Sequence, residues 1–141
     1  MTRPRFDAWI VDSSVALKWF LPVEREPDGE LARSLVGRLA MRTTTLAVYE
    51  VGNILIRQGG WEPARVEAAL ALLGEICGDP IGLEDEDHGA TARIAARHGL
   101  TFYDASYAVI AQRLGRGLLS ADADLLDAKL ATAVSDVGLR A

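Results

Sequence analysis

The sequence predicts an α/β fold built on a mainly parallel sheet, and three observations support this prediction. Short apolar runs alternate with segments of helical periodicity almost throughout the chain, as expected for parallel strands joined by helices. At 141 residues the chain suits one domain with a full core, so we treat 1–141 as a single domain. Hydrophobic residues make up 50% and charged residues 25%, which is typical of a globular protein.

The first predicted strand, Ala8–Asp12, is apolar except for its last residue, an aspartate. Ser13 or Ser14 is then expected to cap a short helix that stops near Pro22. Asp12 itself allows two interpretations. It either begins a turn, or it stands at the carboxyl end of a strand, where α/β proteins bind their ligands.

In the middle of the chain, the sequence predicts three helices and one strand. Leucines at every fourth position from Leu31 to Leu39 indicate a helix that begins near Asp28, and Leu39–Arg42 is the next expected strand. The stretch TTTLAVYEVGNILIRQGG predicts a helix with a threonine cap at its start and two glycines at its end. A further helix begins at Pro63, because proline suits the first helical position.

The last part of the chain continues the alternation. The segment EDEDHGATARIAARHG opens with acids and closes with basic residues, as the dipole of a helix favours. LTFYD is expected to be an extended link. The remaining predicted elements are strands at Pro80–Leu83, GLLSAD and AVSDV, and helices at Ala105–Leu114 and Leu125–Leu130.

The composition argues against several kinds of protein. Cys77 is the only cysteine and there are two histidines, so neither an internal disulfide nor a zinc site is expected. No apolar run reaches the ~20 residues of a membrane helix, and MTRPRFDAWI is too interrupted for a signal peptide, so we expect a cytoplasmic protein. The net charge of −5 argues against a nucleic-acid partner, unless the acids are concentrated in one site.

Four carboxylates stand out from apolar surroundings. Asp12 and Asp122 end predicted strands, whereas Glu50 and Asp104 are the only charged residues within their segments. An ionised acid among apolar neighbours is costly unless a partner or a cation compensates it. No lysine or arginine lies beside Glu50 or Asp104 in the sequence, so these acids are either exposed or share a cation.

The expected topology favours a shared cation. Asp12 and Asp122 would meet at the carboxyl edge of a parallel sheet, and Asp104, at a helix N-terminus, would point toward the same edge. Glu50 lies one turn into its helix with Asn53 on the same face. Oxygen ligands without soft ones specify Mg²⁺ or Mn²⁺, a cation that binds phosphate, activates water and stabilises a leaving oxygen.

Each acid also has a simpler interpretation. Asp104 could be an ordinary N-cap, and Asp122 and Asp124 could cap the helix that follows them. Glu50 caps nothing in mid-helix, although it could lie at the edge of the apolar face. Four separate local roles explain these acids less well than one shared site does.

Four stretches, IVDSSVALKWF, YEVGNIL, GLTFYDASYAVIAQRLG and LLSADADLL, resemble the PIN-domain ribonucleases, and specifically the VapC toxins of toxin–antitoxin pairs. One such stretch alone is a weak signal, whereas four in this order in so short a chain are specific. The resemblance extends from Asp12 to the last helix. It implies a PIN-like α/β/α sandwich around a central parallel sheet.

The resemblance also implies a site, a reaction and partners. The implied activity is Mg²⁺- or Mn²⁺-dependent endonucleolytic cleavage of RNA, leaving a 3′-hydroxyl. The implied partners are a VapB-type antitoxin, whose C-terminal segment wraps the toxin and obstructs the acidic pocket, and a second copy in a homodimer. Ser120 replaces a family hydroxyl that is commonly threonine, and Asp124 is an extra acid. The acidic quartet of the family falls on Asp12, Glu50, Asp104 and Asp122.

The resulting hypothesis is a metal-dependent ribonuclease in which the quartet holds one or two cations and an activated water attacks the phosphodiester. Lys18, on the first helix, would meet a phosphate of the substrate, although its charge could instead reach solvent along its apolar stem. Without the quartet the remaining charges nearly balance, which weakens the objection to RNA. The residues expected to orient the ligands are Ser13, Asn53, Ser120 and Asp124.

Two other classes of function stay open at this point. An acidic-pocket phosphatase or phospho-receiver would use Asp12 as a nucleophile, but such phosphatases carry an aspartate two residues later, where this chain has Ser14. A non-catalytic interaction module would use the acids only to bind an arginine side chain of a partner protein. A covalent phospho-aspartate would support the first, and a lack of Mn²⁺ binding would support the second.

Overall fold

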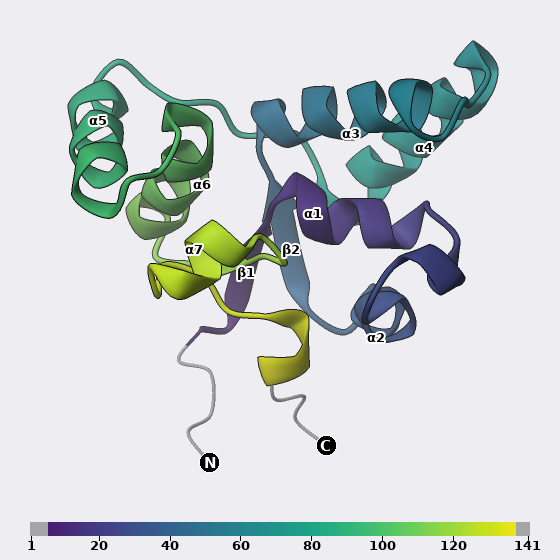
Figure 1. Cartoon of the computed structure of the whole chain (residues 1–141), viewed down its shortest axis with the longest axis horizontal. Coiled ribbons are helices and arrows are strands. Elements are labelled where there is room, and N and C mark those ends of the chain that lie inside the picture. The colour runs from purple at the N-terminus through teal and green to yellow at the C-terminus, as the bar shows by residue number, and fades with distance from the viewer. Residues whose placement is uncertain (1–5, 138–141) are drawn as a thin grey trace.

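The sheet at the centre of the molecule has three parallel strands in the order β2-β1-β3. The computed structural model describes residues 6–137, and the N-terminal residues 1–5 and C-terminal residues 138–141 lie outside this range. The strands are β1 (Ala8–Val11), β2 (Ala40–Thr43) and β3 (Gly117–Leu119), and β1 lies in the middle because it pairs with both of the others. Figure 1 shows β1 and β2 side by side. These positions confirm the strands predicted at Ala8–Asp12, Leu39–Arg42 and GLLSAD.

Each edge of the sheet is extended by one isolated parallel bridge, at Ile81 beside β2 and at Thr132 beside β3. The strand predicted at Pro80–Leu83 is therefore reduced to a single paired residue. The strand predicted in AVSDV is wrong, because Val134–Asp136 forms a 3-10 helix, η3. Both segments are short, and so few apolar residues do not by themselves distinguish a strand from a helix.

The helices of the first half are α1 (Ser13–Ala16), η1 (Leu17–Trp19), η2 (Val23–Arg25), α2 (Gly29–Ser34), α3 (Thr45–Arg57) and α4 (Pro63–Cys77). The threonine cap predicted for α3 is confirmed, because the Thr44 hydroxyl accepts a hydrogen bond from the Ala47 N–H at 3.1 Å. The proline predicted at the start of α4 is also in place.

The second half contains α5 (Asp87–His98), α6 (Phe102–Arg113) and α7 (Ala123–Asp127). The prediction that LTFYD is an extended link before a helix at Ala105 is wrong. Thr101 caps α6, since its hydroxyl accepts the N–H of Asp104 at 3.0 Å, and the residues FYD form the first turn. Asp104 is therefore inside the helix, and its interpretation as an N-cap is wrong.

The last predicted helix, Leu125–Leu130, begins two residues earlier than predicted and ends three residues earlier. The Asp122 side chain accepts the N–H of Asp124 at 2.8 Å and so starts α7 at Ala123. Lys129 has a positive φ of 60°, a conformation that a continuing α-helix does not contain. The helix is thus short, and its first turn carries the acids.

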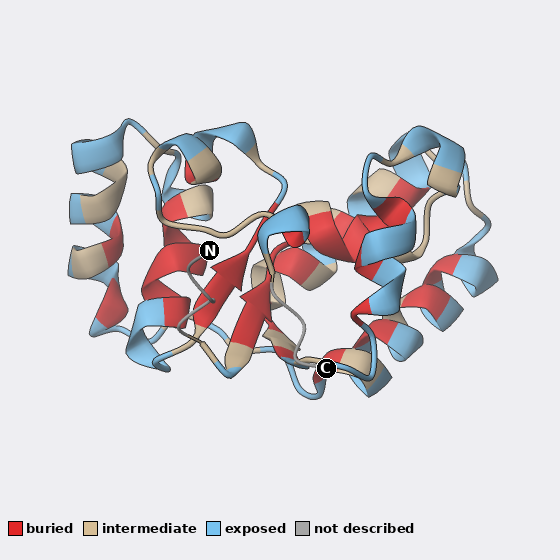
Figure 2. Cartoon of the chain, turned by 90° about the horizontal axis from the view of Figure 1, so that it is seen from below, coloured by how far each residue is buried: buried red, intermediate tan, exposed pale blue. Residues whose placement is uncertain are grey.

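Helices cover both faces of the sheet, because side chains along a strand point alternately to either side. Trp9 and Val11 of β1 pack in one core with residues of α1 to α4, whereas Ile10 packs in a second core with residues of α6 and α7. Figure 2 shows the buried strands between helices whose outer surfaces are exposed. This arrangement confirms the predicted α/β/α sandwich.

The carboxyl ends of the three strands meet at one edge of the sheet, where parallel α/β proteins place their sites. There β1 leads into α1, β2 leads into α3, and β3 leads into the turn before α7. No helix among the described residues is both long and apolar enough to span a membrane.

Candidate active site

Asp12 is fixed at the end of β1 by three hydrogen bonds. Its Oδ1 accepts from the Ser14 hydroxyl at 2.6 Å and from the Val15 N–H at 3.2 Å, and its Oδ2 accepts from the Ser120 hydroxyl at 2.5 Å. The side chain is 3% exposed. Asp12, and not Ser13 or Ser14, is thus the cap of α1, because its carboxylate reaches the N–H three residues on.

The two hydroxyls on Asp12 also hold the turn after β3. The Ser14 oxygen accepts the N–H of Ala121 at 2.8 Å, and the Ser120 oxygen accepts the N–H of Asp122 at 2.9 Å. Each serine therefore joins one oxygen of Asp12 to one backbone N–H of the turn that carries Asp122. Asp12 and Asp122, 110 positions apart in the sequence, are positioned by the same pair of hydroxyls.

Glu50, in the second turn of α3, is held by donors from two other elements. Its Oε1 accepts from the Tyr107 hydroxyl at 2.5 Å and from the Ser13 hydroxyl at 3.3 Å. Tyr107 is 1% exposed, and its burial together with the neighbouring Glu50 raises the pKa of its hydroxyl far above the ordinary value. The tyrosine therefore stays protonated and serves as a permanent donor to Glu50.

Three further acids of the site lie close together. One oxygen of each of Asp104, Asp122 and Asp124 lies within 4.8 Å of one oxygen of each of the others. Asp104 comes from the first turn of α6, and the other two come from the start of α7. Asp124 was predicted to orient the ligands and not to bind the metal, but its carboxylate lies beside those of Asp104 and Asp122. Its N–H also donates to the Asp122 side chain, which caps α7.

The electrostatics of the site show that negative charge is crowded there. Burial raises the pKa of Asp12 to about 6, and the charge of Asp122 adds to this against the lowering effect of the three hydrogen bonds. Burial also raises the pKa of Asp104 to about 6, and the charges of Asp122, Glu50 and Asp124 act in the same direction. Both carboxyl groups are therefore harder to ionise than an isolated aspartate.

The described residues leave this charge without protein cations. The ion pairs found in residues 6–137 join Arg113 to Glu84 and Asp87, outside the site. The donors that reach the acids are neutral hydroxyls and backbone N–H groups. A close set of carboxylate oxygens with no soft ligand and no counter-ion fits a hard divalent cation such as Mg²⁺ or Mn²⁺.

Two predicted residues lie apart from this cluster. Asn53 is exposed on α3, one turn beyond Glu50. Lys18 is 5% exposed, and its ammonium donates to the backbone carbonyl of Pro27. The expectation of a solvent-reaching lysine is therefore wrong, because this charge is enclosed between η1 and the segment before α2.

Two residues of the site escaped sequence reasoning. Tyr107 resembles a core aromatic in an apolar helix, although its position three residues after Asp104 places both on one face of α6. For Ser14 the sequence predicts only a role as a helix cap. Neither the long-range bond from Tyr107 to Glu50 nor that from Ala121 to Ser14 has a local sequence signal.

The fold and the site together define a class of protein: a small α/β protein with an oxygen-rich acidic site at the carboxyl edge of a parallel sheet. The sequence pattern of the PIN domain matches residues 9–130, and the chain belongs to the PIN domain family. The resemblance seen in the four motifs is thereby confirmed.

Three known proteins illustrate this relationship. The chain is 30% identical to Ribonuclease VapC3 of Pyrobaculum aerophilum, over 84% of this chain and 92% of that protein. It is 38% identical to Exonuclease VapC9 of the same organism, over 57% of this chain and 61% of that protein. The crystal structure of Mycobacterium tuberculosis VapC20, a sarcin–ricin loop cleaving toxin, matches with a TM-score of 0.70 at 18% identity, over 86% of this chain and 95% of that one.

Proposed function

We propose that this protein is a metal-dependent ribonuclease, the toxin of a toxin–antitoxin pair, which cleaves RNA phosphodiesters at the acidic site. The observation that carries the proposal is the convergence of Asp104, Asp122 and Asp124 beside Asp12 and Glu50, with no ion pair from residues 6–137 to balance them. The names of the two related VapC nucleases support the same class of activity.

In the proposed mechanism, Asp104, Asp122 and Asp124 would hold the cation together with Oε2 of Glu50, and Asp12 would complete the acidic site. When bound, Mg²⁺ or Mn²⁺ supplies charge neutralisation at the phosphate, activation of the attacking water and stabilisation of the leaving oxygen. Ser14 and Ser120 keep the Asp12 carboxylate in place. Tyr107 and Ser13 occupy Oε1 of Glu50, so that Oε2 is the oxygen left for the reaction.

A nucleophilic Asp12, as in a phosphatase or phospho-receiver, is not favoured. Both of its oxygens already accept hydrogen bonds, and the side chain is 3% exposed. An attacking carboxylate needs an oxygen that can reach the phosphorus, whereas these oxygens are turned toward Ser14, Val15 and Ser120.

The direct test compares two aspartate variants in an RNA cleavage assay with Mg²⁺ or Mn²⁺. We expect Asp104→Asn to lower the rate at least about a hundredfold, because it removes one ligand of the charge-stabilising ion. Asp127→Asn, which removes an exposed acid at the end of α7, is the matched control and should cleave like the wild type. Cleavage by wild type that is undiminished in EDTA would contradict the proposal.

The mode of cleavage is proposed as endonucleolytic, although one relative is named an exonuclease. A circular RNA separates the two modes, since it has no end for an exonuclease to start from. We expect the wild type to open the circle once and to leave a 3′-hydroxyl. A circle that survives while the linear form is shortened stepwise would assign exonuclease activity instead.

The proposed partners are a VapB-type antitoxin, which would obstruct the acidic pocket, and a second copy of the chain. Addition of the antitoxin should abolish cleavage by the wild type, and the mass of the free protein in solution should be that of a homodimer. If the protein binds the antitoxin but neither Mn²⁺ nor RNA, the acids serve only as a docking point and the nuclease proposal fails.

A further inference from the structure

A cavity of about 450 Å³ lies directly beside the acidic site, and the proposed mechanism does not use it. Ser14, Ser120 and Ala121 form the wall that it shares with the site. The hydroxyls of the two serines are the groups that hold Asp12. The size of the cavity lies within the range of small-molecule sites in proteins, about 300–1,000 Å³.

Lys18 lines the cavity, and its ammonium forms no ion pair within the described residues. The residue is 5% exposed, and its ammonium donates to the carbonyl of Pro27. An ammonium has three N–H donors, and a buried one is costly unless they find acceptors. The remaining donors thus favour a ligand that brings an acceptor into the cavity.

The rest of the lining is of two kinds. Leu17, Leu126 and Val134 provide apolar walls, whereas Glu26 and Asp28 bring carboxylates that accept hydrogen bonds. A phosphate alone suits this lining poorly, because the two carboxylates would repel it. A ligand with apolar faces, a carbonyl for the ammonium and N–H groups for the carboxylates suits it well.

We propose that this cavity receives one nucleobase of the RNA, next to the phosphate that is cleaved. This inference rests on the proposed ribonuclease function and adds a means of selecting the substrate. A base taken out of its stack offers flat apolar faces and an edge of donors and acceptors, which is how proteins read single-stranded RNA. The shared wall places the cavity one hydroxyl away from Asp12.

Guanine is the base whose edge matches the lining best. Lysine recognises guanine through the O6 and N7 acceptors, and a carboxylate accepts from its N1–H and amino groups. Adenine has no carbonyl oxygen for Lys18. The cavity is therefore expected to favour guanine over adenine at one position of the RNA.

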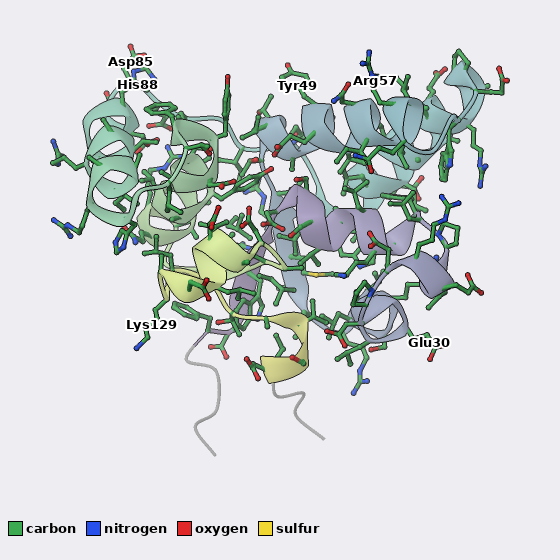
Figure 3. The ribbon with its side chains drawn as sticks, viewed as in Figure 1. Glu30, Tyr49, Arg57, Asp85, His88 and Lys129 are labelled. Carbon is green, nitrogen blue, oxygen red and sulfur yellow. The ribbon has the colours of Figure 1, made fainter. Side chains whose placement is uncertain are left out.

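The chain offers a sharp spectroscopic test, because Lys18 and Lys129 are its only lysines. Protein labelled with ¹³C at the lysine ε-carbon gives one signal from each, and Lys129 lies on the outer surface away from α1 (Figure 3). In EDTA, guanosine 5′-monophosphate should shift the Lys18 signal and leave the Lys129 signal unchanged. The same concentration of adenosine 5′-monophosphate or of inorganic phosphate should shift it much less. Equal shifts with all three, or none, would overturn the proposal.

A kinetic test uses the same two lysines in RNAs that carry either one guanine or one adenine in a uridine background. We expect Lys18→Met to raise KM for the guanine RNA roughly tenfold or more and to remove the preference for guanine over adenine. Lys129→Met is the matched control and should retain both. If Lys18→Met does not fold, the spectroscopic test on the wild type decides alone.

The outcomes separate this inference from the proposed function. If RNA is cleaved but Lys18→Met behaves like Lys129→Met, the base cavity is wrong and the nuclease stands. If no RNA is cleaved but the Lys18 signal responds selectively to guanosine monophosphate, the nuclease is wrong and the cavity stands. If Lys18→Met cleaves normally but no longer binds the antitoxin, the cavity belongs to a protein partner and the inference fails.

Discussion

The two sides of the acidic site hold their carboxylates in different ways. On one side Asp12 is buried and receives hydrogen bonds from Ser14, Val15 and Ser120. On the other side one oxygen of each of Asp104, Asp122 and Asp124 lies within 4.8 Å of one oxygen of each of the others, and Asp124 is exposed. The first side is fixed by neutral donors, and the second is crowded by like charges.

The pKa values of Asp12 and Asp104 are both raised to about 6, yet the causes differ in a way that experiments can separate. For Asp12 the dominant cause is burial, and hydrogen bonds oppose it. For Asp104 burial is joined by three neighbouring acids. A cation should therefore change the Asp104 side most, whereas the hydrogen bonds of the Asp12 side form without a cation.

The largest expected effect is on the pH dependence of stability without metal. Below pH ~4 Asp12 is protonated in both states, whereas between pH ~4 and ~6 it ionises in the unfolded chain first. Its contribution to the free energy of unfolding therefore falls as pH rises through this window, by about 3 kcal/mol. Denaturant unfolding in EDTA at pH 4.5 and 7.5 captures about 2 kcal/mol of this fall, because the unfolded carboxyl is already mostly ionised at pH 4.5, and is measured for the wild type and Asp12→Asn.

The difference in unfolding free energy between the two proteins should shift in favour of Asp12→Asn at the higher pH. Asp127→Asn controls for the loss of one surface charge. A difference that is the same at both pH values would show that burial does not raise the pKa of Asp12. Asp104 acts in the same direction, which makes the wild-type trend in EDTA steeper.

The next effect concerns the cation and should fall mainly on the crowded side. At a Mn²⁺ concentration one hundred times its dissociation constant, binding stabilises a folded protein by about 2.7 kcal/mol. We expect this gain for the wild type and for Asp127→Asn, and a large loss of it for Asp104→Asn. Thermal unfolding with and without Mn²⁺ measures it. Equal stabilisation of all three proteins would place the ion elsewhere.

A smaller effect is expected from Tyr107→Phe, which removes the short hydrogen bond to Glu50 without changing the shape of the core. Residues that orient a ligand typically contribute 10–100-fold to metal affinity or activity. We expect a loss of about tenfold in Mn²⁺ affinity, measured by calorimetry, with cooperative unfolding retained. Unchanged affinity and unchanged cleavage would make Tyr107 a packing residue only.

The smallest effect is expected from Ser13→Ala, because the Ser13 hydroxyl lies 3.3 Å from Glu50 and the Tyr107 hydroxyl lies 2.5 Å away. Hydrogen bonds weaken with distance, and a neutral one contributes about 0.5–1.5 kcal/mol. Mn²⁺ affinity should fall less than for Tyr107→Phe. The reverse order of the two variants would show that Ser13 is the main support of Glu50.

Much of the fold could be predicted from the sequence, because its signals are local. The buried strand before Asp12, the threonine cap of α3 and the proline at the start of α4 each depend on neighbouring residues. Local patterns did not predict which residue caps a helix when several neighbouring residues could do so. Asp12 capped α1 in place of a serine, and Thr101 started α6 three residues before the predicted position.

The site was predictable as a list of acids but not as a geometry. The charged residues in apolar segments identified Glu50 and Asp104, since a lone ionised group there needs a reason. The partners of these acids come from distant parts of the chain, as with Tyr107 on Glu50 and Ser120 on Asp12. Burial of Lys18 likewise depends on the path of the chain at Pro27, which no spacing reveals.

The short edges of the sheet have a consequence for how copies of this chain associate. The outer strands β2 and β3 have only four and three residues, and each already borders an isolated bridge, to Ile81 and to Thr132. A strand of another molecule would meet few unpaired backbone N–H and C=O groups at these edges, which protects the protein from edge-to-edge aggregation. The proposed homodimer would therefore form through helical surfaces, where side chains and not the backbone determine the contact.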